Sequence, residues 1–191
     1  MTDDGVSFLV RQARVKDAAI IARHRARMFQ DMGELSAAVF EDFVEEARGW
    51  LERGLASGEY VGWLGVPRDK PEIIAGGVGV QRRQVAPHPF TDRRFETAVG
   101  LVGGVDTAAP WSRERGFAKG RQAIVINVFT EPEWRRRGLA RLLMEEIVRW
   151  AGSERLDRLV LHASDEARVL YERMGFVPTN EMRYEGTFDE P

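Results

Sequence analysis

The sequence of 191 residues contains no cysteine. This absence excludes disulfides, thiol nucleophiles and cysteine-ligated zinc together, and it is compatible with a reducing compartment. The three histidines, His24, His88 and His162, are far apart and match no spacing that is typical of metal ligands. We therefore expect neither cysteine chemistry nor a metal site.

Long hydrophobic runs and an excess of basic charge are also lacking. No apolar run approaches the roughly 20 residues that span a bilayer, and the first residues, MTDDGVSFLVRQ, do not have the basic-then-apolar pattern of a signal peptide. Lysine and arginine number 28 against 30 acidic residues, so an extended basic surface for nucleic acid is not expected. We expect a cytoplasmic protein with no membrane partner and no nucleic-acid partner.

The first part of the chain, residues 6–80, predicts a strand, two helices and two more strands. The expected strands cover residues 6–10, 60–66 and 73–80, and the expected helices cover residues 15–29 and 36–56. Gly33 ends the first helix and Ser36 is a candidate N-cap of the second. Residues 81–118 are rich in glycine, proline and charge and predict a long loop or insertion, with short structure around Phe95–Val102.

The second half, residues 121–184, has a more specific pattern. An almost continuously apolar strand over 122–129 precedes an amphipathic helix over 136–151 and a buried strand over 159–163. Strand, helix and strand in this order form a βαβ unit with parallel pairing. A short helix over 165–174 and terminal strands at 176–177 and 181–184 would follow. We predict one α+β domain over residues 1–191, with a central mixed sheet of about seven strands flanked by helices.

The junction between the first of these strands and the helix has the character of an anion site. Backbone N–H groups in the first turn of a helix lack intrahelical acceptors, and the helix dipole makes that end electropositive. Gly138 and Ala140 lack bulk, and arginines flank them in the segment Arg135–Arg141. A pyrophosphate could approach such a backbone closely, although an arginine-rich, solvated helix start would give the same string.

Two motifs in this half resemble the GCN5-related N-acetyltransferase (GNAT) family. The family signature [R/Q]-x-x-G-x-[G/A] is matched by Arg135-x-x-Gly138-x-Ala140. The later N-x-x-A-x-x-L-Y-x-x-x-G-F pattern is matched from Ser164 to Phe176, with serine in place of asparagine at its first position. The resemblance is strong over residues 121–176, and elsewhere only the order of elements agrees.

The resemblance implies that acetyl-CoA is the co-substrate and that the βαβ unit binds it. The pantetheine arm would pair with the backbone of Val128, Phe129 and Thr130. Ser164, which also suits an N-cap, stands where the family often has a cofactor contact. The pyrophosphate contacts would come from the backbone of Arg136, Arg137, Gly138, Leu139, Ala140 and Arg141.

The resemblance also places a general acid at Tyr171, where a phenol could protonate the leaving thiolate. A tyrosine buried in the core is the competing interpretation. Two polar residues interrupt the apolar strands: His162 could be the base, and Asn127 could position a water or the substrate. Each could equally be a hydrogen-bonded core residue, and no glutamate lies in either strand.

The predicted function is transfer of an acetyl group from acetyl-CoA to a primary amine of a small molecule. The amine would enter between the first two helices and the long loop, where Arg25 could bind a carboxylate and Asp31 or Glu34 a cation. A protein N-terminal or lysine acetyltransferase is the alternative enzyme, and an acyl-CoA-binding sensor without turnover is the alternative of another class. A homodimer is left open.

Overall fold

The computed structural model describes residues 7–89, 117–179 and 181. Its contacts divide the chain into two compact units. The first combines residues 1–90 with residues 114–162, and the second combines residues 91–113 with residues 163–191. The middle of the expected 81–118 loop, with Phe95–Val102, lies outside the described residues.

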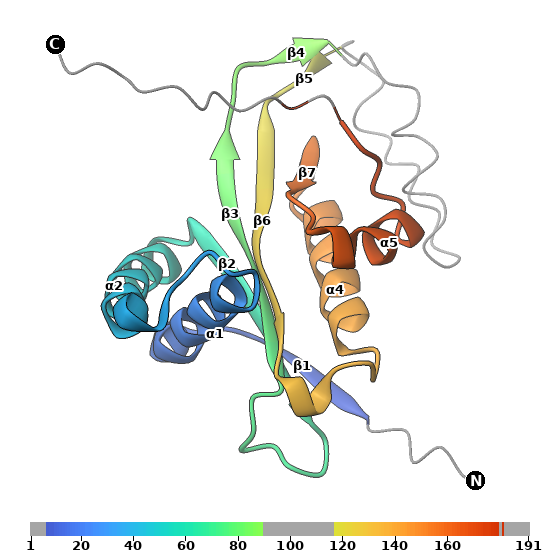
Figure 1. Ribbon diagram of the computed structural model, residues 1–191. Coiled ribbons are helices and arrows are strands. Elements are labelled where there is room, and N and C mark those ends of the chain that lie inside the picture. The colour runs from blue at the N-terminus through green and yellow to red at the C-terminus, as the bar shows by residue number, and fades with distance from the viewer. Residues whose placement is uncertain (1–6, 90–116, 180, 182–191) are drawn as a thin grey trace, which may run out of the picture. The chain divides into compact units, whose positions relative to one another are not determined.

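The first unit is built on a five-stranded sheet (Figure 1). Its strands, in spatial order, are β1 (Phe8–Gln12), β2 (Tyr60–Pro67), β3 (Gly76–Gln84), β6 (Arg121–Thr130) and β7 (Arg158–Leu161). Neighbours are antiparallel except β6 and β7, which are parallel. The predicted mixed sheet and its βαβ unit are therefore confirmed.

The number of strands differs from the prediction of about seven. Within the described residues, the short strands β4 (His88–Pro89) and β5 (Phe117–Ala118) form a separate two-stranded sheet. The strand expected at 176–177 does not form, because the Phe176 N–H donates to the Tyr171 carbonyl (3.0 Å) and closes the preceding helix instead. Most of the strand expected at 181–184 lies outside the described residues.

Helices cover both faces of the sheet in the first unit. Helices α1 (Ala18–Asp31) and α2 (Phe40–Ser57) lie side by side on one face, and α4 (Leu139–Ser153) lies on the other (Figure 1). Short 3-10 turns precede each of them: η1 (Val15–Asp17), η2 (Ala37–Val39) and η4 (Pro132–Trp134). The second predicted helix thus begins as a 3-10 turn, and the Ser36 hydroxyl makes no capping bond. Gly33 has a positive φ of 76°, as a helix end requires.

The core under α1 and α2 is centred on Tyr60, which is 1% exposed. Trp50 of α2 packs edge-on against its ring at 5.9 Å between centroids. Gly79 leaves room for the phenol, because a Cβ at that position would lie 1.8 Å from the Tyr60 oxygen. The aromatic ring of β2 therefore fills the space that the missing side chain of β3 provides. The other buried hydrophobic members of this core are Ala18, Ile21, Ala22, Ala47, Leu51 and Leu64.

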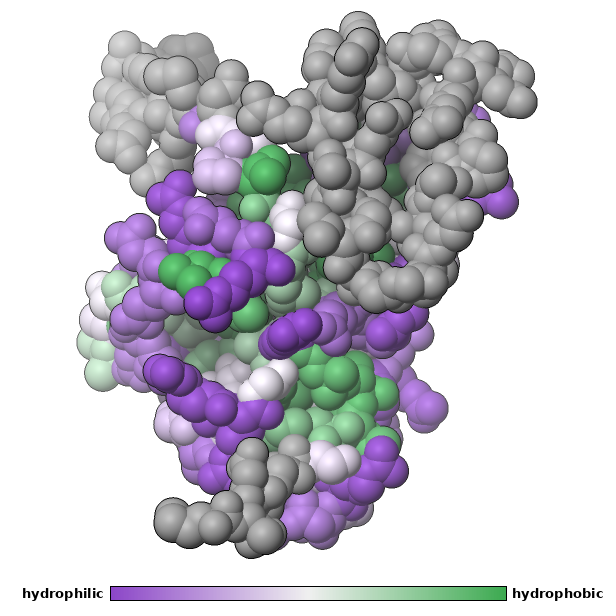
Figure 2. Space-filling model, turned by 90° about the vertical axis from the view of Figure 1, so that its right-hand side faces the viewer, coloured by the Kyte–Doolittle hydropathy of each residue, from purple (hydrophilic) through white to green (hydrophobic). Residues whose placement is uncertain are grey.

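On the opposite face, α4 buries one side against the sheet and exposes the other. The buried side consists of Leu139, Leu143, Met144, Ile147 and Ala151. The exposed side carries ion pairs one turn apart, Arg141 with Glu145 and Arg149 with Glu146. Figure 2, seen from the side on which α4 lies in Figure 1, shows hydrophilic side chains around a hydrophobic patch in the lower half of the view. None of the helices in the described ranges is both long enough and apolar enough to cross a membrane.

The second unit contributes α5 (Asp165–Arg173) to the described residues. Gly175 follows it with a φ of 91°, and its N–H donates to the Glu172 carbonyl (3.0 Å). Tyr171 packs edge-on against Phe176, with 6.0 Å between ring centroids. The predicted helix and its glycine terminator are both present.

Candidate functional site

Strand β6 separates from β7 halfway along its length. The two strands pair from Gln122 and Arg158 to Val125 and Leu161, and among the described strands β6 then continues to Thr130 with β3 as its partner on one edge alone. The register between β6 and β3 shifts at the same point, because Gly79 faces Asn127 whereas Val80 faces Val125. Ile126 is therefore the extra residue of a β-bulge, a feature that often lies beside functional sites.

Beyond Val125, β6 offers backbone hydrogen-bonding groups on the edge that faces away from β3, which we call its free edge. The Glu131 N–H donates to the Ala75 carbonyl (2.9 Å), so Glu131 is bonded toward β3. Bonding direction alternates along an antiparallel strand, so the backbone of Phe129 also faces β3 and that of Val128 and Thr130 faces away from it. The Thr130 carbonyl accepts from Arg135 Nε (3.0 Å). Outside its strand, the Val128 backbone makes no hydrogen bond to a described residue, so it could pair with an extended ligand.

The turn that follows β6 has an unusual backbone. Arg136 has a φ of 63° and Gly138 a φ of 82°. A left-handed conformation costs a non-glycine residue about 1–2 kcal/mol, and residues held in it concentrate at functional sites. These two residues delay the helix, which was expected from Arg136 and begins at Leu139.

The start of α4 presents free backbone donors. The first intrahelical bond runs from the Leu142 N–H to the Gly138 carbonyl (3.1 Å), and no side chain caps the helix. The N–H groups of Leu139, Ala140 and Arg141 therefore have no intrahelical acceptor. A Cβ at Gly138 would meet no atom of the described residues within 4 Å, so the space beside this residue, directly before the helix, is open. An anion suits this position.

A buried hydroxyl lies at the junction of the free edge and the turn. Thr130 Oγ1 is buried and has no hydrogen-bond partner among the described residues. Buried polar groups in proteins are nearly always paired. The unpaired hydroxyl, the free edge of Val128 and the donors of α4 together fit an extended polar ligand that ends in a phosphate group.

Asn127 and Arg25 form a hydrogen-bonded pair on the face of the sheet that α1 covers. Asn127 is 3% exposed, as expected for a polar residue within the strand. Arg25 Nη1 donates to Asn127 Oδ1 (2.8 Å) and to the carbonyl of the bulged Ile126 (2.7 Å). Asn127 Nδ2 lies 3.5 Å from the Tyr60 hydroxyl. Burial lowers the pKa of Arg25 and raises that of Tyr60 far above its ordinary value.

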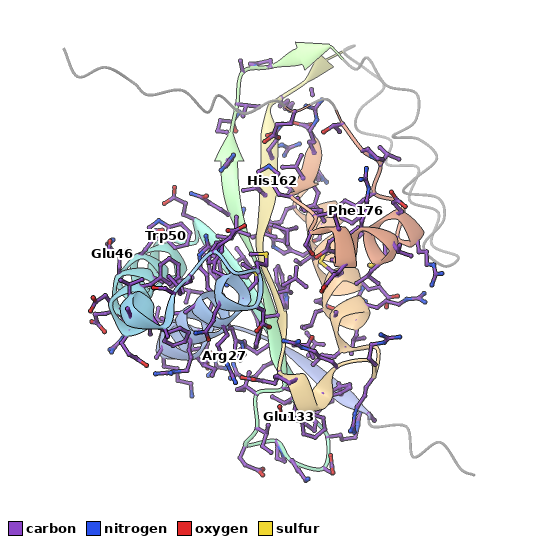
Figure 3. The ribbon with its side chains drawn as sticks, viewed as in Figure 1. Arg27, Glu46, Trp50, Glu133, His162 and Phe176 are labelled. Atoms are coloured by element: carbon purple, nitrogen blue, oxygen red, sulfur yellow. The ribbon has the colours of Figure 1, made fainter. Side chains whose placement is uncertain are left out.

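A second polar cluster, which the sequence did not reveal, joins α1 to the end of β6. Glu131 forms an ion pair with Arg27 (Figure 3). Its other carboxylate oxygen lies 3.3 Å from His24 Nε2. Neither nitrogen of His24 is in hydrogen-bonding geometry with a described group, and the ring lies on Phe129 with 5.0 Å between centroids. Burial, and then the charge of Arg27, lower the pKa of His24 to about 4, so the imidazole is neutral at pH 7.

His162 is not a core residue. The strand expected over 159–163 ends at Leu161, and His162 follows it with an exposed side chain (Figure 3). It comes directly after the last residue of β7 that pairs with β6. The structure thus brings His162, the bulge and the free edge of β6 into one unit, at the point where the two parallel strands part.

Ser164 and Tyr171 belong to the second unit. Ser164 is the N-cap residue of α5, where its carbonyl accepts from Ala167 and Arg168 (both 3.1 Å), but its hydroxyl makes no capping bond. Tyr171 is 7% exposed, and burial raises the pKa of its phenol. The phenol is therefore protonated at neutral pH. In the described part of the chain, no three histidine or acidic side chains gather in a way that could hold a metal.

Comparisons with known proteins found a matching family model and similar solved structures. A family model described as an acetyltransferase (GNAT) domain matches residues 95–178. The crystal structure of a GCN5-related N-acetyltransferase from Ralstonia eutropha JMP134 is similar over 93% of this chain and 97% of that one, with 25% identity and a TM-score of 0.71.

Two further solved structures share the fold. A predicted acetyltransferase with acetyl-CoA from Clostridium acetobutylicum is 20% identical, with a TM-score of 0.70 over 94% of this chain and 96% of that one. The aminoglycoside N-acetyltransferase AAC(6')-Iy in complex with CoA is 13% identical, with a TM-score of 0.60 over 98% and 99%. No curated protein matches by sequence. Residues 95–178 thus match the acetyltransferase (GNAT) domain, and the chain shares its fold with solved GCN5-related N-acetyltransferases.

Proposed function

We propose that this protein transfers an acetyl group from acetyl-CoA to a primary amine of a small molecule, by direct attack in a ternary complex. The observation that carries the proposal is the free edge of β6 beyond Val125, which is followed directly by the backbone donors at the start of α4. Acetyl-CoA has a matching shape, because its pantetheine is an extended amide chain and its diphosphate is an anion. Solved members of this fold contain acetyl-CoA or CoA, which supports the assignment.

The residues present would hold acetyl-CoA along the free edge and the turn. The backbone of Val128 and Thr130 would bond the amides of the pantetheine. Phe129, between them, would hold the strand in place through its pairing with β3. The Thr130 hydroxyl would gain a partner there. Ser164 is proposed as a further contact. The diphosphate would be held by the backbone from Arg136 to Arg141, namely Arg136, Arg137, Gly138, Leu139, Ala140 and Arg141.

When bound, acetyl-CoA supplies an acyl group activated as a thioester. Tyr171 is proposed to donate the proton that the departing sulfur needs, since its raised pKa keeps the phenol protonated. His162 is proposed as the base that takes a proton from the substrate ammonium, directly or through water. Asn127 is proposed to act as a positioning residue, because its side-chain oxygen is already occupied by Arg25.

A small molecule is favoured over a protein as the acceptor by the neighbours that share this fold. Aminoglycoside acetyltransferases are among them, and their names give small amines as substrates. The competing acceptor is a protein N-terminus, since a ribosomal-protein-alanine N-acetyltransferase also has this fold. Competition between peptide and small-molecule acceptors in one assay separates the two.

Two measurements test the proposed function. Acetyl-CoA binds the native state and should raise the melting temperature, by an amount that grows with its concentration. Thiol release from acetyl-CoA should then respond to at least one member of a library of small amines. A melting temperature that is indifferent to a large excess of acetyl-CoA would contradict the cofactor assignment. A shift without thiol release for any amine or peptide would favour a sensor that binds acyl-CoA without turnover.

A further inference from the structure

Arg25 differs from the other two arginines of α1 in its electrostatic partners. Arg23 pairs with Glu41 (3.2 Å), and Arg27 pairs with Glu131. Arg25 has no carboxylate within ion-pair distance in the part of the chain that the structure describes. Its guanidinium lies 4.8 Å from the centre of the Phe29 ring, and burial lowers its pKa. A positive charge is therefore held in a partly dry place without a counter-ion, which is costly in the absence of a ligand.

The hydrogen bonds of Arg25 fix its orientation and leave half of the group free. Nη1 is bonded to the Ile126 carbonyl and to Asn127 Oδ1. Nε and Nη2 make no hydrogen bond to any group among the described residues. These two nitrogens lie on one edge of the planar guanidinium, and such an edge matches the two oxygens of a carboxylate.

The position of Arg25 relative to the free edge identifies which molecule would bring that carboxylate. With the diphosphate at the start of α4, beyond Thr130, the pantetheine would run along Val128 toward Ile126. The thioester end would therefore lie at the bulge, and the bulged residue is the one whose carbonyl Arg25 holds. A carboxylate on Arg25 would thus be close to the carbon that the acceptor amine attacks.

We infer that Arg25 binds the carboxylate of the acceptor, so that the substrates are small molecules carrying both an amine and a carboxylate, as free amino acids do. The inference rests on the proposed function, because it assumes that the acceptor amine is acetylated at the bulge. It also separates this chain from aminoglycoside acetyltransferases. An aminoglycoside is a polycation, and an unpaired guanidinium at the acceptor site repels it.

The test compares free amino acids with their carboxamides, which keep the amine and side chain and lose the negative charge. With acetyl-CoA, at least one amino acid should be acetylated with a kcat/KM about tenfold or more above that of its carboxamide, the range expected for a hydrogen-bonded charge pair. Equal rates for acid and amide, or a preference for a polycationic aminoglycoside, would overturn the inference while leaving the proposed acetyl transfer standing.

Three variants show whether Arg25 is the group responsible. Arg25→Gln keeps a donor for Ile126 and Asn127 but removes the charge, and it should abolish the preference for the acid, mainly by raising KM. Arg25→Lys should retain part of the preference. Arg23→Gln, on the same helix and exposed to solvent, is the matched control and should leave it unchanged. Retention of the preference in Arg25→Gln, with unchanged KM, would overturn the assignment.

Binding measurements keep the inference testable if no amine is acetylated at all, an outcome that would remove the proposed function. Free amino acids and their carboxamides are titrated calorimetrically into the protein with CoA. At least one amino acid should bind more tightly than its carboxamide, and the Arg25→Gln variant should not show this difference. Equal binding of acid and carboxamide in that experiment would overturn the role of Arg25 as well.

Discussion

Leu139 fills the space that a side chain at Gly65 would need: a Cβ on Gly65 would lie 2.4 Å from Leu139 Cδ1. Leu139 is the first residue of α4 and is 1% exposed, so its side chain has little room to rotate away. Gly76 of β3 also lies beside Leu139: a Cβ there would lie 3.3 Å from Leu139 Cδ2, and 2.5 Å from its nearest atom, the Phe129 carbonyl oxygen. Two sheet glycines thus let the start of α4 pack directly onto the sheet, beside the end of β6.

This contact predicts the effect of Gly65→Ala. The added methyl group should push Leu139 off the sheet and destabilise the fold by about 1–3 kcal/mol, the usual cost of overpacking. Because Leu139 also fixes the position of the backbone N–H donors at the start of α4, the affinity for acetyl-CoA should fall as well. Urea unfolding and calorimetric titration measure the two effects.

Gly49→Ala is the matched control, since a Cβ there would meet only Arg53 Nη1, at an ordinary 3.5 Å. In the interior of α2, alanine should stabilise the helix by about 0.5–1 kcal/mol and leave acetyl-CoA affinity unchanged. If Gly65→Ala behaved like Gly49→Ala, Leu139 would not anchor the helix start.

The order of elements could be predicted from the sequence because hydrophobic periodicity reports burial, but several boundaries could not. Strand β3 was expected over 73–80 and runs from Gly76 to Gln84, since Arg82 and Arg83 pair with β6 although their side chains do not suggest a strand. The first residue of α4 was predicted at Arg136 and lies at Leu139. Arg136 adopts a positive φ, and an arginine in a sequence gives no sign of such a conformation.

The candidate site was predictable where a motif is local and unpredictable where contacts are distant. The donors around Gly138 lie within one short segment, and their pattern could be read directly. Asn127 was expected to be buried with a partner, but the partner, Arg25, is 102 positions away in the sequence. Glu131 could not be recognised as a site residue from the sequence, because it lies one residue beyond β6. Its contacts with α1 arise only from the packing of that helix on the sheet.

Gly138→Asp tests the anion site. The substitution places a carboxylate before the free N–H groups of α4, where it competes with and repels a diphosphate, so acetyl-CoA should no longer raise the melting temperature. There is space for the side chain, since no atom lies within 4 Å of the Cβ position. The positive φ of Gly138 should cost the variant about 1–2 kcal/mol of stability.

Gly138→Asn separates charge from shape in this experiment. Asparagine has nearly the same size as aspartate and tolerates the left-handed conformation, but it is neutral. Acetyl-CoA should still raise the melting temperature of the asparagine variant measurably, whereas it should not raise that of the aspartate variant. Full acetyl-CoA binding by Gly138→Asp would place the phosphate site elsewhere in the protein.

Tyr171→Phe tests the proposed general acid. The variant should lower kcat by roughly tenfold or more, as loss of a positioned acid does, while leaving affinity for acetyl-CoA unchanged. Burial raises the pKa of Tyr171, so the phenol stays protonated up to and beyond its ordinary pKa of 10. The rate of the parent enzyme should therefore show no loss from this group below pH 10. A fully active Tyr171→Phe variant would show that the tyrosine serves only packing.

His24 predicts how the stability of the fold depends on pH. Its pKa is about 4 in the folded protein against 6.5 ordinarily, so the unfolded chain binds more protons between these values. Unfolding is therefore favoured as pH falls from 6.5 toward 4, by about 3 kcal/mol over the whole interval, since one pKa unit corresponds to about 1.4 kcal/mol. Above pH 6.5 the imidazole is neutral in both states and makes no such contribution.

His24→Phe should remove this dependence while keeping an aromatic ring on Phe129. Neither ring nitrogen has a hydrogen bond to lose among the described residues, so the fold should tolerate the change. Urea unfolding of parent and variant across the acid range gives the difference in slope, and the comparison at neutral pH isolates any change in packing. Parallel curves for the two proteins between pH 6.5 and 4 would mean that His24 keeps its ordinary pKa, because Glu131 at 3.3 Å would then stabilise a charged imidazole despite its pairing with Arg27.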